Sequence, residues 1–330
     1  MTLANRKSKS KIQPPVPVGV IGLGLMGTSI TTCLLAAGHP VVGIDKDPAR
    51  RRNARKHALA LLREMRREKL LAKNPTPLAG NLTVAADVTA LRASTLVIEC
   101  IFEDLDAKRE ILRQVEEAVG PEALIGSNTS ALPVTELQRG AHHPERILGI
   151  HWAEPAHITR FMEIICGRQT DVRNAEKAIE LARRWNKEPT LVRRDIRGFI
   201  TNRIMYAMIR EAFHLVENGY ATPADVDRSV RNDMGWWITM AGPFRYMDLT
   251  GIPAYAAVMR DLLPDLCCEI QVPKLMRDVV ASGARGVANA KGFYSYTPAQ
   301  AKRWEKRFLD FCYDIRALAL KYRERPEDGK

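Results

Sequence analysis

The sequence feature that most constrains the fold is a glycine-rich turn near the start of the chain. Residues 22–27 read Gly-Leu-Gly-Leu-Met-Gly. An apolar run before them, Val16 to Ile21, predicts a strand, and the run that follows, Gly27 to Ala37, predicts a helix. A second apolar run, Val41 to Ile44, ends at Asp45. The turn alone is weak evidence, but in this order of strand, turn, helix, strand and carboxylate it predicts a dinucleotide-binding site.

Each position of the turn has a physical role in such a site. Gly22 permits the tight turn, Gly24 lets the backbone approach a pyrophosphate, and Gly27 lets the helix pack closely on the strand. The pyrophosphate would lie at the helix N-terminus, beside Leu25 and Met26, where unpaired N–H groups and the helix dipole favour anions. A glycine-rich turn without a ligand is the structural alternative, and the surrounding pattern argues against it.

The carboxylate of Asp45 predicts which dinucleotide binds. A carboxylate at this position accepts hydrogen bonds from the adenosine ribose hydroxyls, and its charge repels a 2′-phosphate. NAD is therefore the predicted cofactor in preference to NADP, although the neighbouring Lys46 weakens this preference slightly.

Short apolar runs continue to alternate with longer amphipathic ones up to about residue 193. Such alternation predicts βαβ units and an α/β fold, a mainly parallel, doubly wound sheet of the Rossmann type. A long helix with a basic exposed side is predicted from Pro48 to about Lys73. Further strands are predicted at Leu96–Cys100, Leu124–Gly126, Ile147–Ile150 and Phe161–Ile165.

The pattern changes near Asp195, beyond which the chain has helical periodicity and no convincing strand. The run Phe199 to Val216 is apolar around much of its circumference and is predicted to be buried. Thr222 to Asp225 matches a helix start with a capping threonine and a proline in the first turn. The predicted segments are a disordered basic tail (1–15), an NAD-binding Rossmann domain (16–194) and an all-helical domain (195–330).

Charge and cysteine content exclude several classes of protein. The net charge is +12, but no nucleic-acid-binding motif accompanies it, so nucleic acid is not a predicted partner. The plainest interpretation is a basic surface with a basic tail, and the charge would also raise the local concentration of an anionic small molecule such as a nucleotide or a CoA ester. No apolar run approaches the roughly 20 residues that span a membrane, and the first 17 residues lack the apolar core of a secretory signal. The six cysteines show neither C-x-x-C nor zinc-like spacing, which predicts buried, reduced thiols, no metal and a cytoplasmic location.

Two polar residues stand out within apolar runs, and each is weak evidence alone. His151 ends a predicted strand, where open α/β sheets bind their ligands, and histidine is the usual base when an alcohol is oxidised. Glu163 lies twelve residues later within FMEII, and buried carboxylates seldom go unpaired. A lone histidine is more often a core residue, yet the two oddities explain each other if they pair. The other histidines show no such partner pattern: His39, His57, His142, His143, His157 and His214.

Seven segments together are far more specific than the glycine turn. They read VGVIGLGLMGTSI, ECIFEDLDAKREIL, SNTSALPVTEL, GIHWAEPAHITRFMEII, RGFITNRI, AGPFRYMDLTGI and KGFYSY. Through them, residues 16–296 resemble the 3-hydroxyacyl-CoA dehydrogenase family. The resemblance implies NAD-dependent oxidation of a 3-hydroxyacyl-CoA, such as 3-hydroxybutyryl-CoA, in fatty acid metabolism. It also implies that the helical domain binds substrate and forms a homodimer.

The resemblance assigns roles to the residues that match the family motifs. It implies that His151 is the acid/base and Glu163 its partner. Ser130 and Asn202 match positions that hold the reacting oxygen and the thioester region of the substrate. Their structural alternatives are a helix cap for Ser130 and a helix-start residue for Asn202.

Three further charged residues match family positions around the ligands. Glu103 and Lys108 match positions near the nicotinamide and the bound substrate, and Lys69 lies where the family approaches the CoA nucleotide. Solvated surface is the structural alternative for both lysines.

The chain also departs from the family pattern. Where the family reads H-F-F-N-P, this chain reads His-Trp-Ala-Glu-Pro, so Glu154 replaces an asparagine. Ala131 replaces a serine, and the bulky Trp236-Trp237 pair lies in the segment expected beside the substrate cleft. These departures leave two alternatives open. One is a dehydrogenase of a non-CoA 3-hydroxy acid, similar to carnitine or gulonate dehydrogenases, and the other is a non-catalytic NAD-binding protein.

Overall fold

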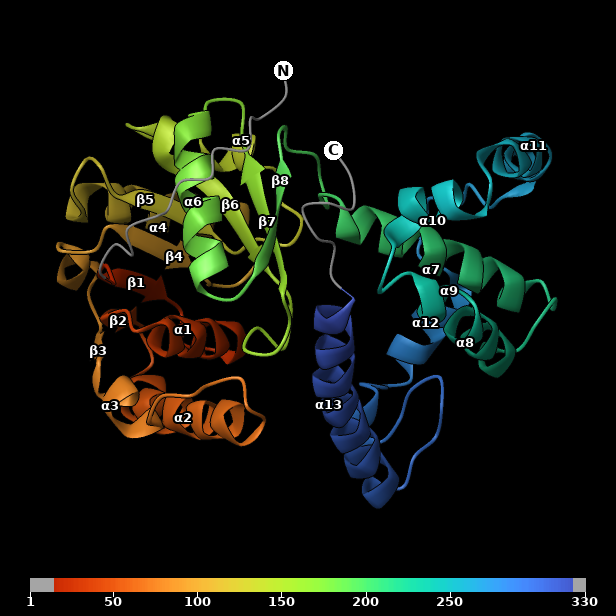
Figure 1. Ribbon diagram of the computed structural model, residues 1–330, viewed down its shortest axis with the longest axis horizontal. Coiled ribbons are helices and arrows are strands. Elements are labelled where there is room, and N and C mark those ends of the chain that lie inside the picture. Colours follow the sequence, from red (N-terminus) through yellow and green to blue (C-terminus); the bar gives the residue numbers. More distant parts are fainter. Residues whose placement is uncertain (1–14, 323–330) are drawn as a thin grey trace. The chain divides into compact units, whose positions relative to one another are not determined.

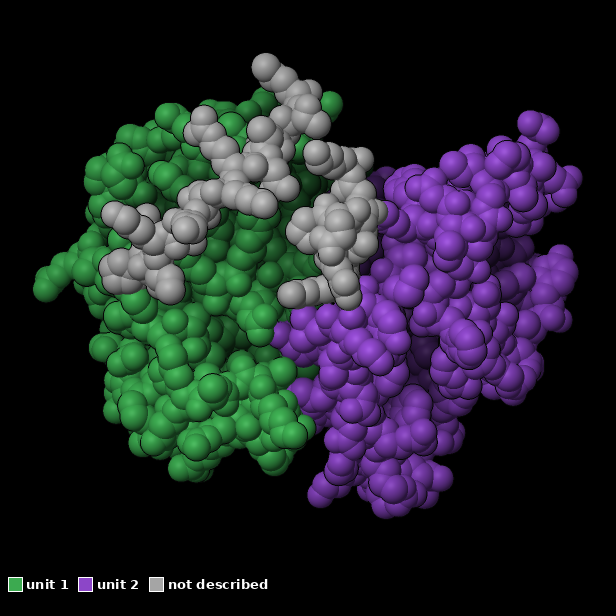
Figure 2. Space-filling model, in the orientation of Figure 1, with its two compact units in different colours: residues 1–199 green, residues 200–330 purple. Residues whose placement is uncertain are grey.

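The computed structural model describes residues 15–322, and the chain divides into two compact units, residues 1–199 and 200–330 (Figure 2). The predicted basic tail lies outside the described residues except for Pro15. The division falls five residues beyond the predicted boundary. Asp195 donates its backbone N–H to the carbonyl of Cys166 at 3.0 Å, and Phe199 is buried at 1% exposure, so residues 195–199 pack with the first unit.

A single eight-stranded sheet, in the order β3-β2-β1-β4-β5-β6-β7-β8, forms the centre of the first unit (Figure 1). Neighbouring strands are parallel except β6 and β7, which are antiparallel. The strands are β1 (Val18–Ile21), β2 (Val41–Ile44), β3 (Leu82–Ala85), β4 (Leu96–Glu99), β5 (Leu124–Ser127), β6 (Ile147–Trp152), β7 (Phe161–Cys166) and β8 (Glu188–Val192). The predicted Rossmann-type sheet is confirmed.

The two edge strands, β3 and β8, were absent from the prediction. Only Leu82 of β3 and Val192 of β8 are buried. An edge strand pairs on one side only and is partly solvated, so it lacks the continuous apolar run that marks a central parallel strand.

Helices cover both faces of the sheet, and alternate strand residues contribute to two separate apolar cores. Val18 and Val20 of β1 point into one core with α1, α2 and α6, whereas Ile21 points into the other core with α4 and α5. The helices of this unit are α1 (Leu25–Ala37), α2 (Pro48–Arg67), α3 (Pro75–Gly80), α4 (Leu105–Ala118), α5 (Val134–Leu137) and α6 (Val172–Arg184).

The predicted helix from Pro48 was too long, because α2 ends at Arg67. Glu68 is its C-cap, and Lys69 has the left-handed conformation, with φ of 60°. That conformation cannot continue an α-helix. Asn74 then caps α3, with Pro75 in its first turn. Arg66 and Arg67 lie in the last turn of α2 and interact favourably with its C-terminal dipole. Lys69 and Lys73 continue the basic run beyond them, so composition alone did not mark where the helix ends.

The second unit contains helices and no β-strand in its described residues, as predicted. Its helices are α7 (Thr201–Glu217), α8 (Pro223–Asn232), α9 (Met234–Trp237), α10 (Gly242–Thr250), α11 (Ile252–Leu262), α12 (Lys274–Ala281) and α13 (Pro298–Lys321). The predicted helix start at Thr222 is confirmed as a capping box with Asp225. Within residues 15–322, no helix is both long and apolar enough to cross a membrane.

The prediction that Phe199 to Val216 forms a buried helix was wrong for α7, although Phe199 itself is buried. No residue of α7 is buried within the chain, and Ile204, Met205 and Met208 are exposed at 55%, 36% and 37%. Apolar periodicity identifies the face of a helix that carries apolar side chains, but it does not show whether other residues of the same chain pack against that face. The cysteine prediction was also wrong in part, since Cys33 and Cys166 are buried and Cys268 is exposed.

Candidate active site

The sheet places His151 directly opposite Glu163. Antiparallel pairing of β6 and β7 aligns the two residues in register, and residues opposite each other point to the same face. His151 Nδ1 lies 2.9 Å from Glu163 Oε2, and the side chains are 8% and 1% exposed. The predicted pairing is therefore confirmed as a contact.

The surroundings of the imidazole leave one nitrogen for chemistry. The rings of Phe161 and Phe199 lie 5.3 and 5.8 Å from the His151 ring, measured between centroids. With Nδ1–H donated to the Glu163 carboxylate, Nε2 carries the lone pair. A carboxylate in this place fixes the tautomer and stabilises the imidazolium that forms when Nε2 takes a proton.

The glycine turn has the geometry that a dinucleotide requires. A Cβ on Gly27 would lie 1.7 Å from the Gly22 carbonyl oxygen, so α1 packs on the strand only because no side chain is there. Gly22 itself has φ of 89°, which favours glycine. Asp45 accepts the backbone N–H of Leu23 at 2.7 Å through Oδ2, which ties the end of β2 to the turn.

The start of α1 fits a phosphate. Gly24 is the N-cap and supplies no side-chain cap, so the N–H groups at Leu25 and Met26 keep no side-chain acceptor. Four N–H groups at a helix start lack intrahelical partners and attract anions. These residues, together with Asp45, fit the predicted cofactor.

Arg50 is a second feature of this turn, and it was not among the predicted site residues. Its Nη1 lies 3.6 Å from Asp45 Oδ2, and a Cβ on Gly24 would lie 3.8 Å from the same nitrogen. The side chain is 56% exposed. Arg50 is in the first turn of α2, five residues after Asp45, and that spacing could have indicated that it points back over the turn.

A cavity of about 620 Å³ opens beside the turn. Its walls come from the starts of α1 and α2 and from the loop after β6, and they include Gly24, Ser29, Arg50, Asn53, His57, Glu154 and His157. Partial burial raises the pKa of the Glu154 carboxyl above its ordinary value. The substitution noted in the sequence therefore places a carboxylate on the wall of the cavity.

Two of the histidines that show no partner pattern in the sequence, His157 and His143, have acidic partners in the structure. His157 Nε2 lies 3.4 Å from Glu64 Oε1, and its Nδ1 lies 2.9 Å from Ser29 Oγ. Burial lowers the pKa of His157, with Glu64 opposing the shift. Glu64 is 93 residues away on α2, so no local pattern could reveal the pair. His143 lies 3.3 Å from Glu145, on the surface.

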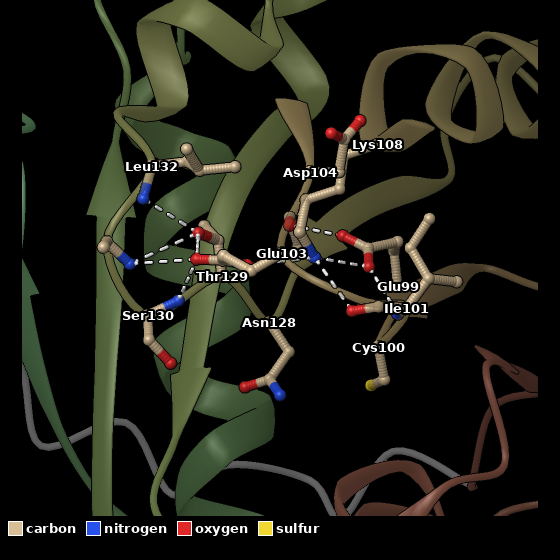
Figure 3. Close-up of polar contacts among 12 residues, drawn as sticks. Glu99, Cys100, Ile101, Glu103, Asp104, Lys108, Asn128, Thr129, Ser130 and Leu132 are labelled. Carbon is tan, nitrogen blue, oxygen red and sulfur yellow. Dashed lines mark hydrogen bonds and ion pairs between the residues drawn. The ribbon is translucent and has the colours of Figure 1, made fainter. Parts of the chain in front are cut away.

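Glu103 and Lys108 form a network between two strand ends (Figure 3). Glu103 Oε1 accepts Thr129 Oγ1–H at 2.5 Å and the backbone N–H groups of Ser130 and Ala131 at 3.0 and 3.2 Å. Lys108 is fully buried, with Nζ 2.7 Å from Glu99 Oε1. Solvated surface is therefore wrong as the alternative for Lys108.

The remaining predicted residues fall in both units. Ser130 is exposed in the loop after β5 and is not a helix cap, since α5 begins after Pro133. Asn202 is the second residue of α7. Lys69 is exposed just past the end of α2.

Asn128 connects the Ser130 loop to the histidine strand. Its side-chain oxygen accepts the backbone N–H of Trp152, the residue after His151, at 2.9 Å. Within residues 15–322, no group of three His, Cys, Asp or Glu side chains could hold a metal ion.

Comparison with known families identifies the group to which this site belongs. The model of the 3-hydroxyacyl-CoA dehydrogenase NAD-binding domain matches residues 17–196, and that of the C-terminal domain matches residues 198–296. The chain belongs to the 3-hydroxyacyl-CoA dehydrogenase family. It is an NAD-dependent oxidoreductase with a Rossmann domain and a helical domain.

Relatives of this dehydrogenase act on different substrates. The chain is 32% identical over 286 residues, 86% of its length and 92% of the relative, to 5-formyl-3-hydroxy-2-methylpyridine 4-carboxylate 5-dehydrogenase of Mesorhizobium japonicum. A crystal structure of such an enzyme, an NAD⁺-dependent dismutase, matches with a TM-score of 0.85 and 29% identity over 93% of this chain and 99% of that one.

Other relatives are CoA enzymes. A probable 3-hydroxybutyryl-CoA dehydrogenase of Deinococcus radiodurans is 30% identical over 282 residues, 84% of this chain and 99% of the relative. The structure of (S)-3-hydroxybutyryl-CoA dehydrogenase from Ralstonia eutropha matches with a TM-score of 0.71 and 27% identity, over 86% of this chain and all of that one.

Proposed function

We propose that the chain oxidises the 3-hydroxyl of a 3-hydroxyacyl-CoA to a ketone, with His151 as the acid/base. The observation that carries the proposal is the buried contact of 2.9 Å between His151 Nδ1 and Glu163 Oε2. It leaves Nε2 as the nitrogen that accepts the hydroxyl proton. Bound NAD would supply the acceptor for the hydride that leaves C3, the carbon that carries this hydroxyl.

The residues around His151 would stabilise the protonated ring and position the substrate. Glu163 stabilises the imidazolium, because the charge that develops on the ring lies next to a buried carboxylate. Ser130 and Asn202 would donate hydrogen bonds to the substrate oxygen as it becomes a carbonyl. Glu103 would lie beside the nicotinamide ring of the bound cofactor.

The basic side of α2 supports a CoA ester as substrate. Arg63, Arg66, Arg67 and Lys69 are all exposed at the distal end of this helix. A cluster of positive charge raises the local concentration of an anionic nucleotide. Membership of the family points to the same substrate class.

A second candidate is a compact substrate without CoA, such as an aromatic hydroxymethyl or formyl carboxylate. The observation that favours it is the near full-length similarity to the pyridine carboxylate dehydrogenase. Glu154 on the cavity wall does not separate the two candidates, because its negative charge opposes CoA phosphates and a substrate carboxylate alike unless a cation offsets it.

The absorbance of NADH at 340 nm, followed as its loss with NADH and as its gain with NAD⁺, separates these candidates. The protein is assayed with acetoacetyl-CoA, with free acetoacetate and with a 5-formyl-3-hydroxypyridine 4-carboxylate, using NADPH as the cofactor control. Preferred turnover of acetoacetyl-CoA is expected from the first candidate. Turnover of the pyridine aldehyde alone would move the assignment to the second. Tight NADH binding with no turnover would indicate a non-catalytic NAD-binding protein.

We also propose that the protein forms a homodimer and is located in the cytoplasm. Exposed apolar side chains on α7 suit a second copy of the chain, as the family resemblance implies, so we expect a homodimer. The described cysteines are present as thiols, which suits the reducing cytoplasm.

A further inference from the structure

Glu99 is a fully buried charged residue at the end of β4, and the sequence assigned it no role. It ends β4, in register with Ile21 of β1 and Ser127 of β5, and it is 0% exposed. Its carboxylate accepts Ser127 Oγ–H at 2.5 Å, the backbone N–H of Ile101 at 2.6 Å and the Lys108 ammonium at 2.7 Å. Burial of an unpaired carboxylate is costly in free energy. The pairing with Lys108 offsets this cost, and the structural role of the Glu99–Lys108 pair is the question that follows.

The Lys108 ammonium is surrounded by three protein oxygens. An ammonium carries three N–H donors. Lys108 Nζ lies 2.7 Å from Glu99 Oε1, 3.3 Å from the Ile101 carbonyl oxygen and 3.4 Å from Glu103 Oε2. Its side chain is 0% exposed. The Glu99 and Ile101 oxygens accept hydrogen bonds from the ammonium and Glu103 forms an ion pair with it, so this fully buried side chain faces protein oxygens and offers no surface to a ligand.

Glu103 connects this buried pair to the loop that carries Ser130. One of its oxygens faces Lys108, and the other accepts Thr129 Oγ1–H and two backbone N–H groups of residues 130 and 131. Burial raises the pKa of Glu103, but the hydrogen bond from Thr129 and the charge of Lys108 outweigh it and hold the pKa below 4.5. The carboxylate is therefore kept ionised, which strengthens each hydrogen bond that it accepts.

We propose that Lys108 and Glu99 are positioning residues that fix the Ser130 loop through Glu103. Glu99 anchors the ammonium, the ammonium orients the Glu103 carboxylate, and the carboxylate holds the backbone of residues 129–131. Asn128 joins the same loop to Trp152 beside His151. The consequence is a Ser130 hydroxyl held at a constant distance from the histidine, and in this respect the inference rests on the proposed function.

The first test compares Lys108→Met, Glu103→Gln and the double variant. We expect Lys108→Met to lower kcat by about 10- to 100-fold, because a small misplacement of a substrate-orienting group has an effect of this size. The Kd of NADH, measured by its fluorescence, should stay within about threefold, since Lys108 touches no ligand. The double variant should be no slower than the slower single variant, because both changes break one chain of contacts. Multiplicative losses in the double variant, or a tenfold weaker NADH affinity with kcat intact, would overturn the proposal.

A second measurement does not depend on turnover. Amide hydrogen exchange at residues 129–131 should be about tenfold or more faster in Lys108→Met and in Glu103→Gln, because the carboxylate no longer holds these N–H groups. The exposed Lys177→Met on α6 is the matched control and should leave both exchange and kcat unchanged. Unchanged exchange in Lys108→Met contradicts the positioning role. If the wild-type protein turns over none of the substrates, only the proposed function fails.

A third variant separates positioning from stability. Lys108→Met leaves Glu99 buried without its cation and is expected to lower Tm. Glu99→Gln combined with Lys108→Met removes both charges and should recover part of that loss. Its kcat should stay low, since Glu103 still lacks its cation. Recovery of kcat together with Tm would show that the pair is merely structural.

Discussion

Nδ1 of His151 lies 2.9 Å from Oε2 of Glu163 across β6 and β7, the antiparallel strand pair of an otherwise parallel sheet. Because opposite residues of an antiparallel pair share a face, two residues twelve positions apart meet without any help from a loop. The pairing buries the carboxylate and directs the second ring nitrogen away from it, which suits proton transfer.

Replacing Glu163 with Gln should lower kcat/KM by about 10²- to 10⁴-fold, because the amide no longer stabilises the imidazolium and can stabilise the wrong tautomer. The Kd of NADH should not change. Steady-state kinetics and NADH fluorescence titration check both statements. The exposed Glu176→Gln on α6 is the control. A Glu163→Gln enzyme with wild-type kcat/KM would remove His151 and Glu163 from the mechanism.

Replacing Arg50 with Leu should weaken NADH binding by about tenfold, the effect of losing one charge-assisted contact with a phosphate. Any activity with NADPH should fall further, because Arg50 is the cation next to Asp45. Fluorescence titration with each cofactor measures both effects. Arg52→Leu, an exposed change in the same helix, should bind like the wild type. Equal affinities in the two variants would place Arg50 away from the cofactor.

Replacing Glu154 with Asn, the usual family residue, should lower the KM of acetoacetyl-CoA several-fold if CoA is a substrate, because a negative charge is removed from the cavity wall. The KM of NADH should change little. The effect should weaken as the salt concentration rises, since ions screen a partly exposed charge. Unchanged KM values at low salt would show that Glu154 does not face the substrate.

Glu103 should make stability depend on acid pH. Its folded pKa is held below the ordinary 4.5, so its contribution is fully present above 4.5 and is lost as pH falls through the lower folded value. The difference in free energy of unfolding between the wild type and Glu103→Gln should therefore be constant near neutrality and shrink below pH 4.5. Urea denaturation at several pH values measures it. A difference that grows on acidification would contradict the assigned direction.

The chain should sediment as a dimer of twice 37.0 kDa, because apolar side chains along α7 are exposed in the single chain. Ile204→Asp combined with Met208→Asp should shift the mass toward that of the monomer at micromolar concentration. Analytical ultracentrifugation is the measurement. Val172→Asp, an exposed apolar position on α6, is the control and should leave the mass unchanged. A monomeric wild type would refute the expectation for α7.

Features that depend on neighbouring residues could be predicted from the sequence by itself. The glycine turn and the capping box at Thr222 are of this kind. Central strands are also of this kind, because burial on both faces requires a continuous apolar run. His151 and Glu163 could be matched because each was anomalous within such a run.

Tertiary structure alone decided which charged residues are enclosed. The sequence presents Lys108 as one of many surface-like lysines, and only the packing of α4 against the end of β4 shows that it is fully buried beside Glu99. Arg50 and the pairing of His157 with Glu64 likewise depend on where α2 lies. Periodicity reports that a face avoids water. The residues that pack against such a face, and the charged residues that pair with one another, lie far apart in the chain. Contacts of this kind leave no local pattern in the sequence.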